Sequence, residues 1–195
     1  MTEEMLIDGI LRHDRRALGL LVDRYQRQVI KTAHYFLGSM EDAEDLSQEI
    51  FIEIIRAMPS FRKTSSLSTW IYRITVNRSL NHLKSRKRKA FVLRLQDIFR
   101  GGEVEGLREV REPVADPRDH DHREKRALIR TALDKLPGNQ RIAFVLTQYD
   151  GLSYKQVAEV MNTGLPAVES LIHRARQNLR KQLAGNFPEY QKTSR

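Results

Sequence analysis

Apolar side chains recur with a period near 3.6 residues over most of the chain, which is typical of amphipathic α-helices. The first such segment is Thr2–Arg12. A second follows Asp14, a candidate N-cap, and runs to about Leu37. Gly38 is a natural helix stop, because glycine readily adopts the left-handed conformation of a C-terminal cap. This part of the chain therefore predicts two helices in succession.

The third predicted helix, about Met40–Met58, is strongly acidic, and Ser39 is its candidate N-cap. No basic residue appears in it before Arg56. Apart from its apolar core face, another face carries three polar side chains and an isoleucine: Asp45, Gln48, Glu49 and Ile52. Such a face suits either solvent or the basic surface of a partner protein.

The segment Phe61–Lys89 begins with a polar loop, Arg62–Ser66, and continues as a helix that ends in a basic run. Ser66 and Ser68 are both candidate N-caps. One stripe of this helix combines an aromatic ring, amides and cations: Trp70, Arg73, Asn77, Asn81 and Lys84. An aromatic ring can stack on an unpaired base, amides can read base edges, and cations neutralise phosphates. The alternative is that Trp70 belongs to the core and the basic run is a solvated helix end.

From 91 to 122 glycine, proline and acidic residues interrupt the pattern, which predicts a flexible acidic linker. Residues 91–99 can either extend the preceding helix or form a short one. His120 and His122 flank Asp121 in this segment. A metal site would need a further ligand at suitable spacing, and the sequence offers none. A solvated loop is the favoured interpretation, and we expect neither a metal nor a cofactor.

The last third begins with an amphipathic helix over Arg123–Leu136 and an apolar helix over Gln140–Tyr149. Ser153 and Gln156 have the spacing of a capping box, which predicts the start of a short helix. A turn over Asn162–Leu165 follows. Pro166 then stands where the first turn of a helix accepts proline.

The final helix has the clearest periodicity in the chain. Its apolar side is formed by Val168, Leu171, Ile172, Ala175 and Leu179. The opposite side is polar and basic: Ser170, His173, Arg174, Gln177 and Lys181. A short helix, a tight turn and a second helix with polar outer residues predict a helix-turn-helix that reads the major groove. An ordinary helical hairpin with solvated cations is the alternative.

Composition favours a polyanionic partner, because the 195-residue chain has a net charge of +9. The absence of cysteine excludes disulfides and thiolate metal sites. No apolar run approaches the ~20 residues of a membrane span, so we expect no membrane insertion. The N-terminus is acidic and lacks a long apolar core, which argues against a signal peptide.

Three stretches together resemble the extracytoplasmic-function (ECF, group IV) class of bacterial RNA polymerase sigma factors, in the sigma-70 family. They are DAEDLSQEIFIEIIR at Asp42–Arg56, FRKTSSLSTWIYRITVNRSLNHLK at Phe61–Lys84, and LPGNQRIAFVLTQYDGLSYKQVAEVM with AVESLIHRARQNLRKQL in the last third. They follow the order of the family's regions 2 and 4. The resemblance implies an all-α fold of two small helical domains, a region 2 bundle and a region 4 helix-turn-helix, joined by a flexible linker.

In region 2, the resemblance implies docking on the coiled coil of the polymerase β′ subunit through Asp45, Gln48 and Glu49. It also implies that the loop and the following helix read the −10 element and open the duplex. Asn77 stands where the reader of a flipped-out base begins, and Arg62–Thr69 corresponds to the wall of its pocket. The implied −10 contacts are Arg62, Lys63, Thr64, Ser65, Trp70, Arg73, Asn77, Asn81 and Lys84.

In region 4, the resemblance implies major-groove reading of the −35 element. The implied contacts are Lys155, Glu169, Ser170, His173, Arg174 and Gln177. The sequence departs from the family pattern here, since many members have glycine-threonine before the recognition helix and a base before the serine. This chain has Leu165–Ser170, with Glu169 before the serine. A carboxylate cannot contact phosphate favourably, though it can accept from a cytosine amine, so the departure concerns the −35 sequence and not the fold.

The resemblance implies domain bounds of 1–90 for region 2, 91–122 for the linker, 123–185 for region 4 and 186–195 for a tail. The expected function is that of a cytoplasmic, nucleoid-associated sigma factor, not an enzyme. It binds core RNA polymerase (the β′ coiled coil and the β subunit), directs it to promoter DNA and promotes melting. No space remains for a region 3 domain or an N-terminal autoinhibitory region, so control by a separate anti-sigma factor is expected.

Two other classes of protein fit parts of the sequence. A helix-turn-helix regulator that acts without polymerase explains the last third, but leaves the acidic helix and the Trp70 stripe without a role. A metal-dependent nucleic-acid enzyme would use carboxylates between Glu41 and Glu53. Those acids lie on one helix that lacks a histidine or a second carboxylate cluster at suitable spacing, which disfavours the enzyme.

Overall fold

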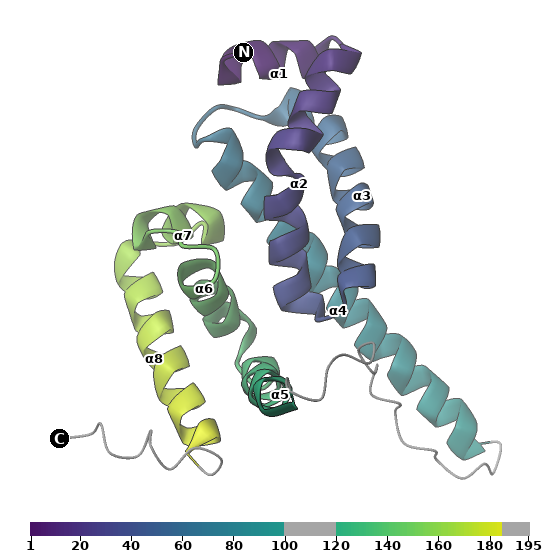
Figure 1. Ribbon diagram of the computed structural model, residues 1–195, viewed down its shortest axis with the longest axis vertical. Helices are drawn as coiled ribbons and strands as arrows, with labels where there is room; N and C mark the ends of the chain where they lie inside the picture. Colours follow the sequence, from purple (N-terminus) through teal and green to yellow (C-terminus); the bar gives the residue numbers. More distant parts are fainter. Residues whose placement is uncertain (100–119, 185–195) are drawn as a thin grey trace. The chain divides into compact units, whose positions relative to one another are not determined.

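A computed structural model describes residues 1–99 and 120–184, in which all regular structure is helical (Figure 1). The first compact unit contains α1 (Glu3–Leu11), α2 (Arg15–Leu37), α3 (Met40–Ala57), the 3₁₀ turn η1 (Met58–Ser60) and α4 (Leu67–Phe99). The second contains α5 (His120–Asp134), α6 (Gly138–Gln148), α7 (Tyr154–Met161) and α8 (Leu165–Leu183). The prediction of an all-α chain with two helical domains is confirmed.

In the first unit, α2, α3 and the first half of α4 pack against one another, and α1 crosses one end of this bundle (Figure 1). The second half of α4 extends beyond the ends of α2 and α3 (Figure 1). The core is mostly aliphatic and includes Leu21, Val29, Ile50, Ile54 and Ile71, all fully buried. Because these residues recur at helical spacing, one side of each helix is committed to the core and the other side is left for solvent or partners.

The predicted helix signals operate as expected. Asp14 and Ser39 cap α2 and α3 through side-chain oxygens that accept from the Arg16 and Asp42 amides, at 2.8 and 3.1 Å. Gly38 ends α2 with a φ of 77°, in the left-handed region. These signals involve residues at most a few positions apart, so they act before any tertiary packing.

The crossing of α1 over α2 depends on a small residue at Gly9. A Cβ atom at this position would lie 2.5 Å from the Ala17 Cβ, whereas a Cβ at Gly19 on α2 would meet nothing within 4 Å. We expect Gly9→Val to lower the free energy of unfolding by about 1–3 kcal/mol through overpacking. Gly19→Val, the matched control, should change it by no more than ~0.5 kcal/mol.

Urea unfolding followed by the fluorescence of Trp70 measures both variants, because this single tryptophan lies in the same unit as the two glycines. Equal midpoints for Gly9→Val and Gly19→Val would contradict the tight crossing of the two helices.

The second unit is organised by α8, which packs against α5, α6 and α7. Apolar residues of α5 and α8 form one part of its core: Ala132, Leu133, Leu136, Ala175 and Leu179. The Asn178 side-chain amide also donates to the Gln140 side-chain oxygen at 2.8 Å, which ties α8 to α6. Contacts on one side of α8 therefore fix its position in the unit, and the opposite side is left exposed.

Several predicted boundaries differ from the structure. Of the alternatives left open for residues 91–99, the structure shows the extended helix, because α4 continues to Phe99. By contrast, α5 already begins at His120, so His120 and His122 lie in a helix and not in a loop. The next helix, α6, begins at Gly138 and not at Gln140, with the extended Pro137 as its N-cap. The fixed φ of proline suits a helix start. Pro137 and Gly138 therefore begin α6, in addition to separating it from α5. The rest of the predicted linker and the tail lie outside the described residues.

Candidate nucleic-acid and protein interfaces

The acidic face of α3 projects away from the core. The apolar side of α3, with Leu46 and Ile50, is buried, whereas Asp45, Gln48 and Glu49 are all exposed. Ile52 belongs to the same face and remains 50% exposed. We call Asp45, Gln48, Glu49 and Ile52 the docking face. It combines negative charge with an exposed apolar side chain, which suits a basic protein surface with apolar contacts.

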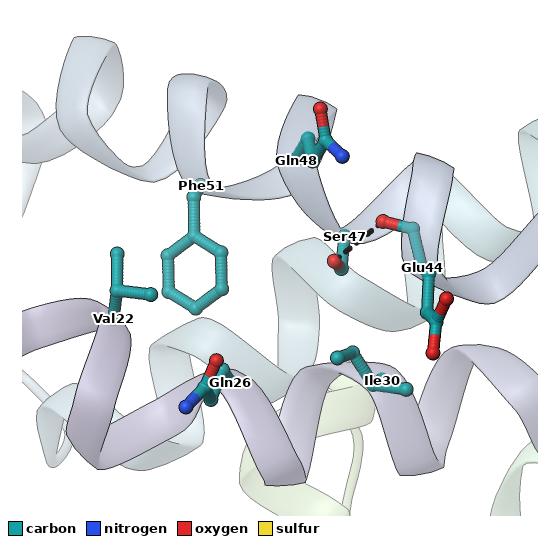
Figure 2. A pocket seen from close by; sticks show the side chains of 7 residues that line it. All are labelled: Val22, Gln26, Ile30, Glu44, Ser47, Gln48 and Phe51. Carbon is teal, nitrogen blue, oxygen red and sulfur yellow. Dashed lines mark hydrogen bonds between the residues drawn. The ribbon is translucent and has the colours of Figure 1, made fainter.

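A groove of about 390 Å³ adjoins the docking face between α2 and α3 (Figure 2). Its lining comes from both helices: Val22, Gln26, Ile30, Glu44, Ser47, Gln48 and Phe51. Figure 2 shows the Phe51 ring projecting from α3 toward α2, while the Ser47 hydroxyl donates to the Glu44 carbonyl at 2.6 Å. Gln48 belongs to both surfaces, so a partner on the docking face also reaches the groove. The sequence did not reveal this groove, because it requires two helices to meet.

The predicted loop Arg62–Ser66 is confirmed, and it ends in a well-anchored helix start. Ser66, not Ser68, caps α4: its hydroxyl accepts from the Thr69 amide at 3.1 Å. Ser68 and Gln28 instead join α4 to α2, because the Ser68 hydroxyl donates to the Gln28 side-chain oxygen at 3.2 Å. The implied pocket wall therefore includes the first turn of α4.

Glu3 of α1 provides a further anchor at this helix start. Its carboxylate accepts from the Leu67 amide at 3.2 Å, across a sequence separation of 64 residues. Negative charge at a helix N-terminus is favourable, because the amides there lack partners within the helix. Neither Glu3 nor Gln28 was identified from the sequence. A carboxylate at the start of α1 gave no local signal of this role.

Burial shifts the pKa values of Tyr25 and Arg141. Burial raises the pKa of the Tyr25 hydroxyl. The positive charge of Arg24 partly opposes this rise, and the negative charge of Glu3 adds to it. Burial lowers the pKa of the Arg141 guanidinium, and the carboxylate of Asp134, 2.8 Å away, opposes this effect. Both shifts follow from packing within one unit and not from a catalytic arrangement.

Trp70 packs partly within the protein. It is half buried against the core, and its ring centroid lies 5.0 Å from that of Phe61, with a tilt of 42°. This pair fixes the residue before the loop against the first turn of α4. The ring remains partly exposed, so a contact between Trp70 and DNA stays a prediction.

The rest of the predicted stripe divides by exposure. Asn77, Asn81 and Lys84 are exposed, whereas Arg73 is half buried. The loop residues Arg62, Lys63 and Thr64 are exposed and Ser65 is half buried, and Lys63 has a left-handed φ of 55°. The loop leads directly into the helix that carries the stripe, and most polar side chains of both are exposed.

Ion pairs connect the acidic helix α3 to α4. Arg78 pairs with Glu53, and Arg86 pairs with Asp42 at 2.8 Å. All four side chains are at least one-third exposed, so each pair contributes at most about 1 kcal/mol. Two of the cations that the sequence placed in the basic helix are therefore already engaged by acids on α3.

The helix-turn-helix is confirmed in α7 and α8. Ser153 and Gln156 form the predicted capping box, and Pro166 lies in the first turn of α8. The left-handed turn residue is Asn162, with a φ of 51°, whereas Gly164 is extended and precedes α8. All the predicted reading residues are exposed: Lys155, Glu169, Ser170, His173, Arg174 and Gln177. The His173 and Gln177 side chains form a hydrogen bond at 3.0 Å, so they present one surface.

Within residues 1–99 and 120–184, no helix combines the length and the apolar composition that crossing a membrane requires. The same described residues contain no group of three or more histidine or carboxylate side chains that could hold a metal ion.

Comparison with known proteins relates both units to transcription. Residues 21–89 match the family Sigma-70 region 2, and residues 126–179 match the family Sigma-70, region 4. The RNA polymerase sigma-H factor of Pseudomonas aeruginosa is 33% identical over 186 residues, which cover 93% of each chain. The ECF RNA polymerase sigma-E factor of Escherichia coli K12 is 32% identical over 182 residues, covering 91% of this chain and 92% of that protein.

Solved structures have the same fold. CnrH, in complex with the cytosolic domain of CnrY, superposes with a TM-score of 0.65 at 23% identity, covering 95% of this chain and 99% of CnrH. The sigma factor RpoE of Bartonella quintana, in complex with the anti-sigma factor NepR, gives a TM-score of 0.57 at 23% identity, covering 85% and 95% of the two chains.

Proposed function

Since the chain belongs to the extracytoplasmic-function class of the sigma-70 family, we propose how its residues divide the work of transcription initiation. A sigma factor binds core RNA polymerase, directs it to promoters and is not itself an enzyme; this is the function of the chain. The observation that carries the residue assignment is the exposure of most of the predicted contact side chains, in the loop Arg62–Ser66 and on helices whose opposite sides are buried.

We propose that the docking face binds the coiled coil of the polymerase β′ subunit. Asp45 and Glu49 supply negative charge, and Gln48 extends the contact into the groove. Charge complementarity of this kind increases association rates and selects against wrong partners. The β subunit is a second proposed contact in the core enzyme.

We propose that the loop Arg62–Ser66 and the stripe with Asn77 hold the unpaired strand of the −10 element. Stacking of one base on a protein contributes roughly 1–3 kcal/mol, and one base-pair step of duplex stacking is worth about 1.4 kcal/mol. A few captured bases therefore nearly offset local opening of the duplex. The anchors at Glu3 and Gln28 support this role, because a loop held in place loses less conformational entropy on binding.

We propose that α8 reads the −35 element with the side chains around Arg174, and that Lys155 on α7 contacts the backbone. Neither unit alone needs to bind tightly, because tethering raises the effective concentration of the second contact. The proposed bounds remain 1–90, 91–122, 123–185 and 186–195 for region 2, the linker, region 4 and the tail. We also propose action in the cytoplasm at the nucleoid and control by an anti-sigma factor.

In vitro transcription with core polymerase on a promoter library tests the proposed function. Transcripts that depend on this chain, initiating downstream of a common pair of elements, are the expected result. A chain that binds DNA but neither associates with polymerase nor changes the transcripts would be an ordinary helix-turn-helix regulator.

Arg174→Ala should weaken binding to the selected −35 half-site by about 1–3 kcal/mol and lower the slope of its salt dependence by about 1. Arg176→Ala is the matched control, since Arg176 is exposed on α8 but points to a different side of the helix. Anisotropy titrations of a labelled duplex at several salt concentrations measure both quantities. Equal losses of affinity for the two variants would contradict the assignment of Arg174 to the reading surface.

A further inference from the structure

A second basic surface lies on α2, outside all the contacts assigned above. Arg16, Leu20, Arg24, Arg27 and Lys31 follow one another at intervals of three or four residues, so they form one row along the helix. All five are exposed. We call these five residues the basic row. Asp23, the one acid in the sequence of α2, lies beside it and leaves the surface strongly positive.

The arginines of the basic row are not paired with acids in the part of the chain that the structure describes. Within residues 1–99 and 120–184, Arg16, Arg24 and Arg27 form no ion pair. Arg24 contacts a ring instead, with its guanidinium carbon 5.6 Å from the centre of the Tyr25 ring. By contrast, Arg78 and Arg86 of the same unit form ion pairs with acids of α3.

The position of the row links it to the loop Arg62–Ser66. Gln28, which hydrogen-bonds with Ser68 in the first turn of α4, has Arg24 four residues before it and Lys31 three residues after it. Such neighbours lie side by side on a helix surface. The row therefore passes beside the point where the loop leads into α4. From Arg16 to Lys31 it runs along α2 for about 22 Å at ~1.5 Å per residue.

We propose that the basic row binds the phosphates of the unpaired DNA strand as it leaves the loop Arg62–Ser66. This inference rests on the proposed function, in which that loop captures bases of the melted −10 element. The charge of the row suits a polyanion, and its length suits several nucleotides. The exposed Leu20 offers an apolar contact between the cations.

The sign of the charge separates this surface from the docking face. A basic protein surface that suits Asp45 and Glu49 would be repelled by Arg24 and Arg27. The row also lies on a different side of α2 from the groove-lining residues Val22 and Gln26. DNA on the row and polymerase on α3 can therefore be bound together.

The test uses holoenzyme and fork-junction DNA with a promoter selected by the transcription experiment. The DNAs carry single-stranded thymidine tails of 0, 4, 8 or 12 nucleotides downstream of the −10 element. The variant is Arg16→Gln with Arg27→Gln. The charge-matched control is Arg15→Gln with Lys135→Gln, two exposed cations that are outside the row and outside the assigned contacts.

Wild-type and control holoenzymes should bind more tightly as the tail lengthens. The row variant should lose most of this gain and bind the tail-less fork normally. For the longest tail, the slope of log affinity against log salt should fall by about 1.4, from two cations at ~0.7 each. Circular dichroism and Trp70 fluorescence verify that the variant is folded.

Three results would each overturn the proposal. The row variant could retain the full gain from the tail, the control could lose it equally, or the row variant could lose core-polymerase affinity with unchanged tail dependence. The last result would assign the row to an acidic protein surface. Failure of the proposed function is a separate outcome, since wild-type holoenzyme would then not bind the tail-less fork.

Discussion

Gln48→Ala combined with Glu49→Lys should weaken the affinity for core RNA polymerase by at least about tenfold, or ~1.4 kcal/mol. Both side chains are exposed on the docking face, and coupling energies between close charges at protein interfaces are about 1.5–7 kcal/mol. Reversal of one charge replaces attraction by repulsion, while loss of the amide removes the contact shared with the groove. Titration of labelled chain with core polymerase, at low and moderate salt, measures the change.

The control is Asp8→Lys, which makes the same change of charge on an exposed residue of α1. It lies in the last turn of its helix, where a cation is favourable. Its affinity for polymerase should remain close to that of the wild type. Unchanged affinity of the Gln48 and Glu49 variant, with its fold intact, would count against docking through this face of α3.

Asn77→Ala should reduce open-complex formation by about 5- to 150-fold, the equivalent of the ~1–3 kcal/mol that one well-made base contact contributes. The side chain is exposed on α4, and its proposed ligand is a base that becomes available only after the duplex opens. Closed-complex affinity should therefore change less than the extent of opening. Permanganate reactivity of unpaired thymines measures opening, and a mobility shift at low temperature measures closed-complex binding.

Asn139→Ala provides the matched control, because Asn139 is also an exposed helical asparagine but lies in the second unit. Equal effects of the Asn77 and Asn139 substitutions would show that the loss of opening is not specific to Asn77. Parallel losses of closed and open complexes in the Asn77 variant would assign Asn77 to duplex binding, not to capture of a base.

Much of the fold could be predicted because its signals are local. Asp14, Ser39 and Ser153 each begin a helix through a hydrogen bond to an amide two or three residues away. The apolar period then decides which side of each helix is buried. Boundaries without such a cap were less certain. The end of α4 was left open between two alternatives, and α5 starts at His120 and not at Arg123. Glycines and prolines indicate that a helix stops without fixing where.

The candidate contact residues were accessible to sequence reasoning for a related reason. Gln48, Asn77 and Arg174 each lie on a helix whose opposite side is apolar, so the helical period alone predicts that they point outward. The resemblance to a family added what they are expected to contact. It could not indicate the partners that exposed side chains have within the protein, as the pairing of Arg86 with Asp42 illustrates.

The sequence by itself therefore determined the helices, their buried faces and the family to which the chain belongs. Only the tertiary structure identified Glu3 and Gln28, whose contacts with Leu67 and Ser68 span 64 and 40 residues. It also decided that Trp70 packs on Phe61 and that a groove adjoins the docking face. The physical reason is that a helical period fixes the direction of a side chain from its own helix, whereas the atoms it meets belong to elements that folding brings together.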